Sequence, residues 1–267
     1  MVELTRSEQL PDIAGQFSLQ GRRALVTGAG RGIGRAIALG LAGAGAAVAL
    51  ASRSAEQLDE ARLVVAEAGG TAVALPADLA DAGRIPALVD DAEDGLGGPI
   101  DIVVHSAGTQ HRSPAATFPL AEWEHLLSVN LTAPFLLSQE LGRRQLDRGE
   151  PGSHIFVCSL TSILGLPNLA AYNAAKSGLM GVVRALSVEW SGAGIRVNGI
   201  SPGYVETAMT HELMADPVRN AQLLARIPMG HFGTPEQLAA PAVFLASEAA
   251  AYLTGQLLIV DGGWAAA

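Results

Sequence analysis

The sequence of 267 residues contains one cysteine, no cluster of basic residues and no apolar run long enough to cross a membrane. The lone Cys158 excludes an internal disulfide and a cysteine-cluster metal site, and it fits a reducing cytoplasm. Lys and Arg number 17 against 26 Asp and Glu, and the resulting net charge of -9 argues against a nucleic-acid or anionic-membrane surface. The uncharged stretch from Ala36 to Ser52 contains glycines and is shorter than the roughly 20 residues of a spanning helix. We therefore expect a cytoplasmic protein that binds neither nucleic acid nor membrane.

The hydrophobic pattern predicts an α/β fold. A composition of 49% hydrophobic and 16% charged residues excludes general disorder. Short aliphatic runs alternate with longer segments of helical period, which is the pattern of βαβ units around a parallel sheet. The expected strands are 24–27, 47–51, 72–75, 100–105, 154–159, 195–200 and 257–260, and the expected helices are 34–44, 55–68, 85–95, 121–146, 170–190 and 235–246. Because the strands are almost wholly apolar, we predict a three-layer, doubly wound sandwich with a seven-stranded parallel sheet covered on both faces.

We expect a single domain over residues 19–267, preceded by a polar N-terminal arm at 1–18. One segment, at about 204–234, joins the sixth strand to a late helix and is far longer than the roughly 2 to 6 residues of an ordinary connection. Long insertions at the carboxyl ends of parallel strands tend to cover ligands, so this segment is predicted to be a substrate lid. The alternative is a surface excursion that packs on a neighbouring subunit.

The first expected strand leads into a glycine-rich turn, Thr27-Gly28-Ala29-Gly30-Arg31-Gly32-Ile33-Gly34, and a helical pattern begins at once. Glycines allow a tight turn and let the backbone approach a pyrophosphate, whose charge is met by the amides and dipole of the helix N-terminus. Helix capping is the alternative role of such a turn, but its position on the first βα unit favours a dinucleotide site.

The end of the second expected strand indicates which dinucleotide is bound. NAD binders usually place Asp or Glu there to bond the ribose hydroxyls, whereas this chain has Ser52-Arg53. A small hydroxyl followed by a cation suits a 2′-phosphate, and Arg31 offers a second guanidinium. The alternative is that both arginines are solvated surface charges. We expect NADP(H) to be favoured, with NAD(H) left open.

Tyr172 and Lys176 lie four residues apart in an expected helix and so share a face, and Ser159 is expected to close the fifth strand. A lysine ammonium near a tyrosine favours the phenolate and makes it a usable acid and base. A serine hydroxyl at a strand end can hydrogen-bond a substrate oxygen where charge develops. Taken singly, each has a structural alternative: a packing tyrosine, a surface lysine, and a serine that caps a helix.

As a set, these residues resemble the classical short-chain dehydrogenase/reductases over nearly the whole chain, from about Leu19 to Trp264. The matching features are the glycine turn, Tyr172 to Lys176 as Tyr-x3-Lys, Ser159 at 13 residues before the tyrosine, Asn130, Asp78-Leu79, Pro202-Gly203-Tyr204-Val205-Glu206-Thr207 and Asp261-Gly262-Gly263. The resemblance implies a Rossmann fold, a nicotinamide cofactor, hydride transfer without a metal, and a homotetramer formed through the helices at 121–146 and 170–190 and the last strand.

The resemblance also implies roles for four catalytic residues. Tyr172 exchanges a proton with the substrate oxygen and Ser159 orients that oxygen. Lys176 lowers the pKa of the tyrosine and holds the nicotinamide ribose, while Asn130 anchors a water in a proton relay. The cofactor-binding residues expected from the sequence and the resemblance together are Gly28, Arg31, Gly32, Ile33, Gly34, Ser52, Arg53, Asp78, Leu79, Ser106, Ala107, Gly108, Tyr172, Lys176, Pro202, Gly203, Val205 and Thr207.

The chain departs from the family after the fourth strand, where His105-Ser106-Ala107-Gly108 replaces the usual Asn-Asn-Ala-Gly. The asparagines there mainly support the sheet and the backbone that faces the cofactor. We therefore expect altered local hydrogen bonding, and a satisfied structural role for His105 in place of a catalytic one.

The substrate-binding residues expected are Gln110, Arg112, Thr161 and Tyr204. The chain most resembles a branch of the family that includes gluconate 5-dehydrogenases, so Arg112 is predicted to grip the carboxylate of a small sugar acid in a two-pronged bond. A surface position for Arg112 is the alternative. Two other enzyme classes remain, a 3-oxoacyl thioester reductase and a broad ketone reductase, and so does a catalytically silent dinucleotide sensor.

Overall fold

The computed structural model describes residues 10–267, and in this part of the chain seven parallel strands form one sheet. Their order is β3-β2-β1-β4-β5-β6-β7, so the sheet grows outward from β1 and β4 in two directions. The strands are β1 (Arg23–Thr27), β2 (Ala47–Ser52), β3 (Ala72–Pro76), β4 (Ile102–His105), β5 (Gly152–Val157), β6 (Ile195–Pro202) and β7 (Leu257–Val260). The first nine residues of the predicted N-terminal arm lie outside the described residues.

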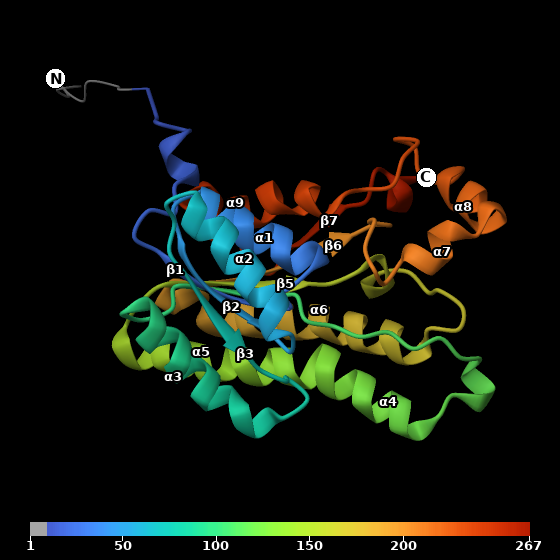
Figure 1. Ribbon diagram of the computed structural model, residues 1–267, viewed down its shortest axis with the longest axis horizontal. Coiled ribbons are helices and arrows are strands. Elements are labelled where there is room, and N and C mark those ends of the chain that lie inside the picture. The colour runs from blue at the N-terminus through green and yellow to red at the C-terminus, as the bar shows by residue number, and fades with distance from the viewer. Residues whose placement is uncertain (1–9) are drawn as a thin grey trace, which may run out of the picture.

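Helices cover both faces of the sheet (Figure 1). The helices are α1 (Gly32–Gly43), α2 (Ala55–Glu67), α3 (Ile85–Leu96), α4 (Leu120–Leu127), α5 (Ala133–Arg148), α6 (Ala170–Trp190), α7 (His211–Ala215), α8 (Pro217–Leu224) and α9 (Ala239–Ala246). One face carries α1, α2 and α9, and the other carries α3, α5 and α6. Successive strand residues alternate between the layers: Val26 packs with α1, and its neighbour Leu25 packs with α3 and α5. The predicted α/β fold with a seven-stranded sheet is confirmed.

The structure corrects two element boundaries that bear on the site. β5 ends at Val157, so Ser159 does not close the strand; it caps the 3-10 helix Leu160–Ser162, and its Oγ accepts from the amide of Thr161. The helix expected at 121–146 is divided by a π-helical turn at Ser128–Thr132. Pro134 has no N–H to donate to the carbonyl of Asn130 in the α-helical pattern, which explains why the helix widens here.

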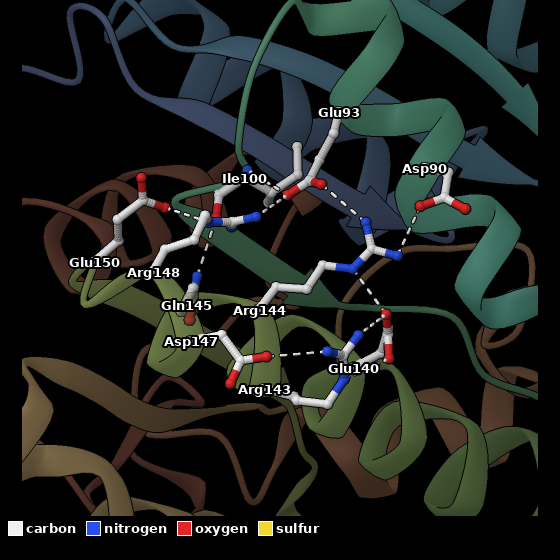
Figure 2. Close-up of polar contacts among 10 residues, drawn as sticks. All are labelled: Asp90, Glu93, Ile100, Glu140, Arg143, Arg144, Gln145, Asp147, Arg148 and Glu150. Atoms are coloured by element: carbon white, nitrogen blue, oxygen red, sulfur yellow. Dashed lines mark hydrogen bonds and ion pairs between the residues drawn. The ribbon is translucent and has the colours of Figure 1, made fainter.

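An ion-pair network joins α3 to α5 (Figure 2). The Arg144 guanidinium contacts the carboxylates of Asp90 and Glu93 on α3 and of Glu140 on its own helix, at N–O distances of 2.7, 2.9 and 2.7 Å. Arg148 adds a second contact to Glu93 at 3.1 Å. The C-terminal half of α5 is therefore anchored to α3.

The segment after β6 leaves the sheet and returns to it. It carries α7 and α8, which stand beyond the end of β6 (Figure 1). Its two ends pair with each other, because the amide of Gly233 donates to the carbonyl of Tyr204 and the amide of Glu206 donates to the carbonyl of Gly233. Its base rests on Trp264, which lies 4.7 Å from the Tyr204 ring and 4.2 Å from the Arg226 guanidinium. That this excursion acts as a lid stays a prediction.

Candidate active site

The main cavity, of about 750 Å³, lies at the carboxyl ends of the strands. β1 and β4 are neighbours at its centre, and the chain leaves them toward opposite edges of the sheet. In doubly wound sheets this reversal point is where ligands bind. The lining comes from the turn after β1, the ends of β2 and β3, the loops after β4 and β5, the start of α6, and the segment after β6.

The glycine turn after β1 forms an uncapped helix N-terminus. Gly28 has φ +69°, and a Cβ there would lie 2.8 Å from the amide nitrogen of Ala107, so only glycine fits. The N-cap of α1 is Arg31, whose side chain makes no capping hydrogen bond. Within residues 10–267 the first amides of α1 therefore remain without side-chain acceptors, as a phosphate cradle requires.

The end of β2 fits a 2′-phosphate. The Ser52 Oγ is buried and has no hydrogen-bond partner within residues 10–267. Arg31 and Arg53 line the same cavity as Ser52, and the side chain of Ser54 is used locally to cap α2. A buried hydroxyl without a partner beside two guanidiniums matches the acceptor oxygens and charge of a phosphate. Asp78 and Leu79 line the cavity after β3, where the adenine end of a dinucleotide was expected.

The loop after β4 is held by backbone contacts that the sequence did not reveal. Thr27 Oγ1 accepts from the amides of Ser106 and Ala107 at 3.2 and 3.3 Å. The amide side chain of Asn130 pairs with the backbone of Thr109 twice, donating to its carbonyl and accepting from its N–H at 2.8 and 2.9 Å. Asn130 therefore holds the shape of this loop, and its role in a proton relay stays a proposal.

Tyr172 and Lys176 both come from the first two turns of α6 and line the cavity together with Ser159. The Lys176 Nζ donates to the carbonyl of Val157 at 2.7 Å and lies 5.7 Å from the centroid of the Tyr172 ring. Lys176 is almost fully buried. The three residues are thus brought together, as the sequence predicted.

Burial is the largest influence on the pKa values of Tyr172 and Lys176. Burial raises the pKa of Tyr172 to about 12, while a hydrogen bond with Ser159 acts in the opposite direction. Burial also lowers the pKa of Lys176 to about 8. Desolvation of the phenol outweighs the charges around it, and the Lys176 ammonium is directed to the carbonyl of Val157. That Lys176 lowers the pKa of Tyr172 stays a prediction.

His105, which replaces the family's usual asparagine, takes part in a buried series of hydrogen bonds. His105 Nε2 lies 2.7 Å from Ser138 Oγ, and the same hydroxyl lies 3.0 Å from His154 Nδ1. His154 Nε2 lies 3.0 Å from Gln145 Oε1, and Gln145 Nε2 donates to the carbonyl of Ile100 (Figure 2). Burial lowers the pKa of His105, and it lowers that of His154 to about 3, so both rings are neutral.

Gln145 determines which atoms donate and which accept along this series of hydrogen bonds. Gln145 Oε1 can only accept, so His154 carries its proton on Nε2 and accepts from Ser138 on Nδ1. Ser138 then has no proton left for His105, which must donate from Nε2. The remaining nitrogen, His105 Nδ1, has no partner within the described part of the chain. The expectation of a fully satisfied histidine is wrong for this atom.

The segment after β6 reaches back to the glycine turn. The amide of Gly203 donates to the carbonyl of Val260, and the amide of Thr207 donates to Thr210 Oγ1 at 3.0 Å. The methyl group of Thr207 lies 3.5 Å from where a Cβ on Gly32 would stand. The cavity wall beside the N-terminus of α1 is formed by Pro202, Gly203, Val205, Thr207 and Thr210.

All four predicted substrate residues line the cavity: Gln110, Arg112, Thr161 and Tyr204. The guanidinium of Arg112 makes no hydrogen bond and no ion pair with any of residues 10–267. Burial raises the pKa of both Tyr172 and Tyr204, and the charge of Arg112 acts in the opposite direction on both. Thr161 Oγ1 is buried without a partner in the same part of the structure.

Several lining residues were missed by sequence reasoning. Gln57 reaches the adenosine end from α2, Leu166 and Leu169 come from the loop before α6, and Met209 and Leu213 come from the excursion after β6. The leucines and the methionine carry no local signal, because an apolar residue on any helix or loop face looks the same in sequence. The hydroxyl of Thr210 had one weak signal, its position three residues after Thr207.

The comparisons with known proteins agree with this geometry. A family model described as enoyl-(acyl carrier protein) reductase matches residues 28–265. The chain belongs to the short-chain dehydrogenase/reductase family. It is 40% identical to gluconate 5-dehydrogenase of Gluconobacter oxydans over 253 residues, which are 95% of this chain and 97% of that one.

Two solved structures are similar along nearly the whole fold. One, from Beutenbergia cavernae, is classed as an NAD(P)-dependent gluconate 5-dehydrogenase and has NADP bound; it is 46% identical, has a TM-score of 0.89, and the match covers 95% of this chain and 100% of that one. The other is a gluconate 5-dehydrogenase from Burkholderia cenocepacia in complex with NADP and tartrate, at 38% identity, a TM-score of 0.90, and coverage of 94% and 98%. The resemblance to the family and to its gluconate 5-dehydrogenase branch is confirmed.

No helix among residues 10–267 is both long and apolar enough to span a membrane. Within the same residues, no three His, Cys, Asp or Glu side chains come together as a set of metal ligands.

Proposed function

We propose that this protein is an NADP(H)-dependent oxidoreductase that interconverts a hydroxyl and a keto group on a small sugar acid. The observation that carries the proposal is one cavity that joins a phosphate cradle, the Ser159, Tyr172 and Lys176 set, and the Arg112 guanidinium, which has no partner in the described structure. The relatives named above act on gluconate, and two related structures contain NADP. Preference for NADP(H) over NAD(H) is supported by Ser52 and Arg53.

The residues of the chain have separable tasks in this reaction. When bound, the cofactor accepts or supplies the hydride. During oxidation, Tyr172 removes the proton of the substrate hydroxyl, and during reduction it returns a proton to the same oxygen. Ser159 donates a hydrogen bond to that oxygen, and Lys176 supplies a buried positive charge beside the phenol.

The raised pKa of Tyr172 in the protein alone means that the phenolate is scarce before the ligands bind. Arg112 then has two effects. Its charge favours the phenolate, and its guanidinium matches a carboxylate in two-pronged geometry. A substrate acid placed between these groups has its charged end held while a carbinol carbon faces the cofactor side.

The test is turnover by the purified protein with NADPH on 5-keto-gluconate, a 3-oxoacyl thioester and simple ketones. We expect the keto acid to be reduced best, and Tyr172→Phe to lower kcat by about 10²- to 10⁴-fold while the affinity for NADPH stays within a factor of a few. Tyr252→Phe is the matched control, because Tyr252 is fully exposed. Turnover confined to the thioester would favour a 3-oxoacyl thioester reductase over a sugar-acid enzyme. Binding of NADPH without any turnover would favour a catalytically silent dinucleotide sensor.

We also infer a cytoplasmic homotetramer. Val188 on α6 is 83% exposed and Ile259 on the edge strand β7 is 39% exposed, and both are apolar surfaces that a second copy would cover. The single buried Cys158 suits a reducing compartment. Analytical ultracentrifugation checks the assembly, and a monomer at micromolar concentration would contradict it.

A further inference from the structure

A second cavity, of about 420 Å³, adjoins the active site on the far side of Arg112. Its lining residues are Arg112, Pro167, Asn168, Leu213, Arg219, Gln222 and Leu223. Arg112 and Leu213 line both cavities, whereas Tyr172 and Ser159 line only the first. Arg112 therefore lies where the two cavities meet, and the second cavity is an open one between the loop before α6 and the excursion. We refer to this second cavity as the chamber.

The second cavity contains two guanidiniums and no carboxylate among its lining residues. Arg219 comes from α8, and its one ion pair in the described structure is a 3.6 Å contact from Nε to Asp216. Asp216 is mainly occupied as the cap of α8, where its Oδ1 accepts from the amides of Val218 and Arg219. The two Nη atoms of Arg219 have no acceptor in residues 10–267. The Arg219 side chain is 64% exposed, so its guanidinium is accessible to a ligand that enters this cavity. Two arginines and no acidic residue among the described lining residues give the cavity a positive charge, in a chain whose net charge is -9.

Each wall of this chamber is braced by its own hydrogen bond. Asn168 has φ +61°, an uncommon conformation that asparagine tolerates better than most residues. Its carbonyl accepts from the amide of Ser113 at 3.1 Å, which fixes the segment that carries Arg112. On the other side, Asn220 Nδ2 donates to the carbonyl of Met214 at 2.9 Å and ties α8 to α7. The two arginines are thus presented by separately braced segments.

We infer that Arg219 and Arg112 together form a carboxylate subsite, and that Arg219 is a specificity residue for acidic substrates. The inference rests on the proposed function and adds the residue that the excursion contributes to it. Each guanidinium can bond a carboxylate in a planar, two-pronged manner, and two of them can share its four lone-pair directions. An aldonate is then held by its carboxylate end at this boundary, while its hydroxylated chain extends toward Tyr172.

The experiment compares gluconate with glucitol, the polyol in which a CH₂OH group replaces the carboxylate. Oxidation of each by NADP⁺ is measured for the wild type, Arg219→Gln, Arg219→Lys and Arg112→Gln. Arg62→Gln is the matched control, because Arg62 on α2 also pairs with an aspartate three residues earlier and lines neither cavity. Arg219→Gln is expected to raise KM for gluconate about tenfold, with kcat and the kinetics on glucitol unchanged. Arg219→Lys restores part of the loss, and Arg62→Gln has no effect.

Calorimetric titration of gluconate into the NADP⁺-bound protein tests the same subsite without turnover. Weaker binding to Arg219→Gln than to the wild type, with unchanged binding of glucitol, supports the subsite even if gluconate is not the substrate that is oxidised. Equal gluconate affinity in the two proteins, or no affinity in either, overturns it. An equal loss for gluconate and glucitol also overturns it, because the effect would then be on the shape of the excursion. Failure of the proposed function is recognised separately, as wild-type turnover that excludes sugar acids.

Discussion

The buried histidine pair predicts that this protein loses stability in mild acid. His154 is completely enclosed, and burial lowers its pKa to about 3 from an ordinary value of 6.5. Between these two values the unfolded chain binds a proton at His154 that the native protein does not bind. The free energy of unfolding therefore falls as the pH falls below about 6.5. His105 shifts in the same direction, because it is also buried and because His154 is nearby.

The magnitude follows from the His154 values. Each pH unit in the affected range changes the free energy of unfolding by about 1.4 kcal/mol per site, so a drop from pH 7.5 to pH 5 costs about 2 kcal/mol at His154 alone. The hydrogen-bonded chain adds a geometric reason for the loss. A protonated His154 would carry a proton on Nδ1, which faces the Ser138 hydroxyl, and Ser138 would have to turn its own proton away. The Ser138 oxygen would then accept from both histidines, and the proton of its hydroxyl would lose the acceptor that His154 Nδ1 provides.

Urea unfolding followed by circular dichroism at pH 7.5 and pH 5.0 measures this effect. We expect the wild type to lose at least about 2 kcal/mol between the two conditions, and His154→Gln to lose less by about that amount, although the variant is less stable at pH 7.5. His211→Gln serves as the control, since His211 is exposed at the start of α7. If the wild type and His154→Gln lose the same free energy between pH 7.5 and pH 5.0, the reasoning is refuted.

Three further predictions concern the cofactor and the packing. Arg53→Ala should lower kcat/KM for NADPH about tenfold and leave NADH unchanged, because a 2′-phosphate loses a guanidinium. Gly142→Ala should lower the free energy of unfolding by about 1 to 3 kcal/mol, since its Cβ would lie 2.6 Å from the Trp190 ring; Gly43→Ala has open space and should cost nothing. Arg144→Met should cost about 2 kcal/mol in chemical unfolding, because partly buried carboxylates of α3 and α5 lose their cation.

A different result would contradict each of these three predictions. Equal losses with NADPH and NADH in Arg53→Ala would show a structural effect at the end of β2. A Gly142→Ala protein as stable as Gly43→Ala would mean that Trp190 moves aside without cost. No change in Arg144→Met would mean that the network in Figure 2 is as weak as solvent-exposed ion pairs usually are.

Local motifs were readable from the sequence because their geometry is set by short spacings. A strand, a glycine turn and a helix occupy adjacent residues, so the phosphate cradle at 28–34 follows directly from the order of residue types. Tyr172 and Lys176 are four residues apart on one helix, which places them on one face whatever surrounds them. The alternation of apolar strands and amphipathic helices likewise determined the layered α/β fold.

The tertiary structure decided everything that depends on packing between distant segments. The π-helical turn pairs Asn130 with Thr109. The hydrogen bonds that run from His105 to Gln145 join β4, β5 and α5. In sequence, Arg219 is one half of an ordinary helical ion pair, and only the fold brings it to the chamber that Arg112 borders. The sign of the Tyr172 shift could not be read from a lysine four residues away, because desolvation depends on all the atoms that surround the phenol. Spacing along the chain determines which groups can meet, whereas burial determines their charge and their partners.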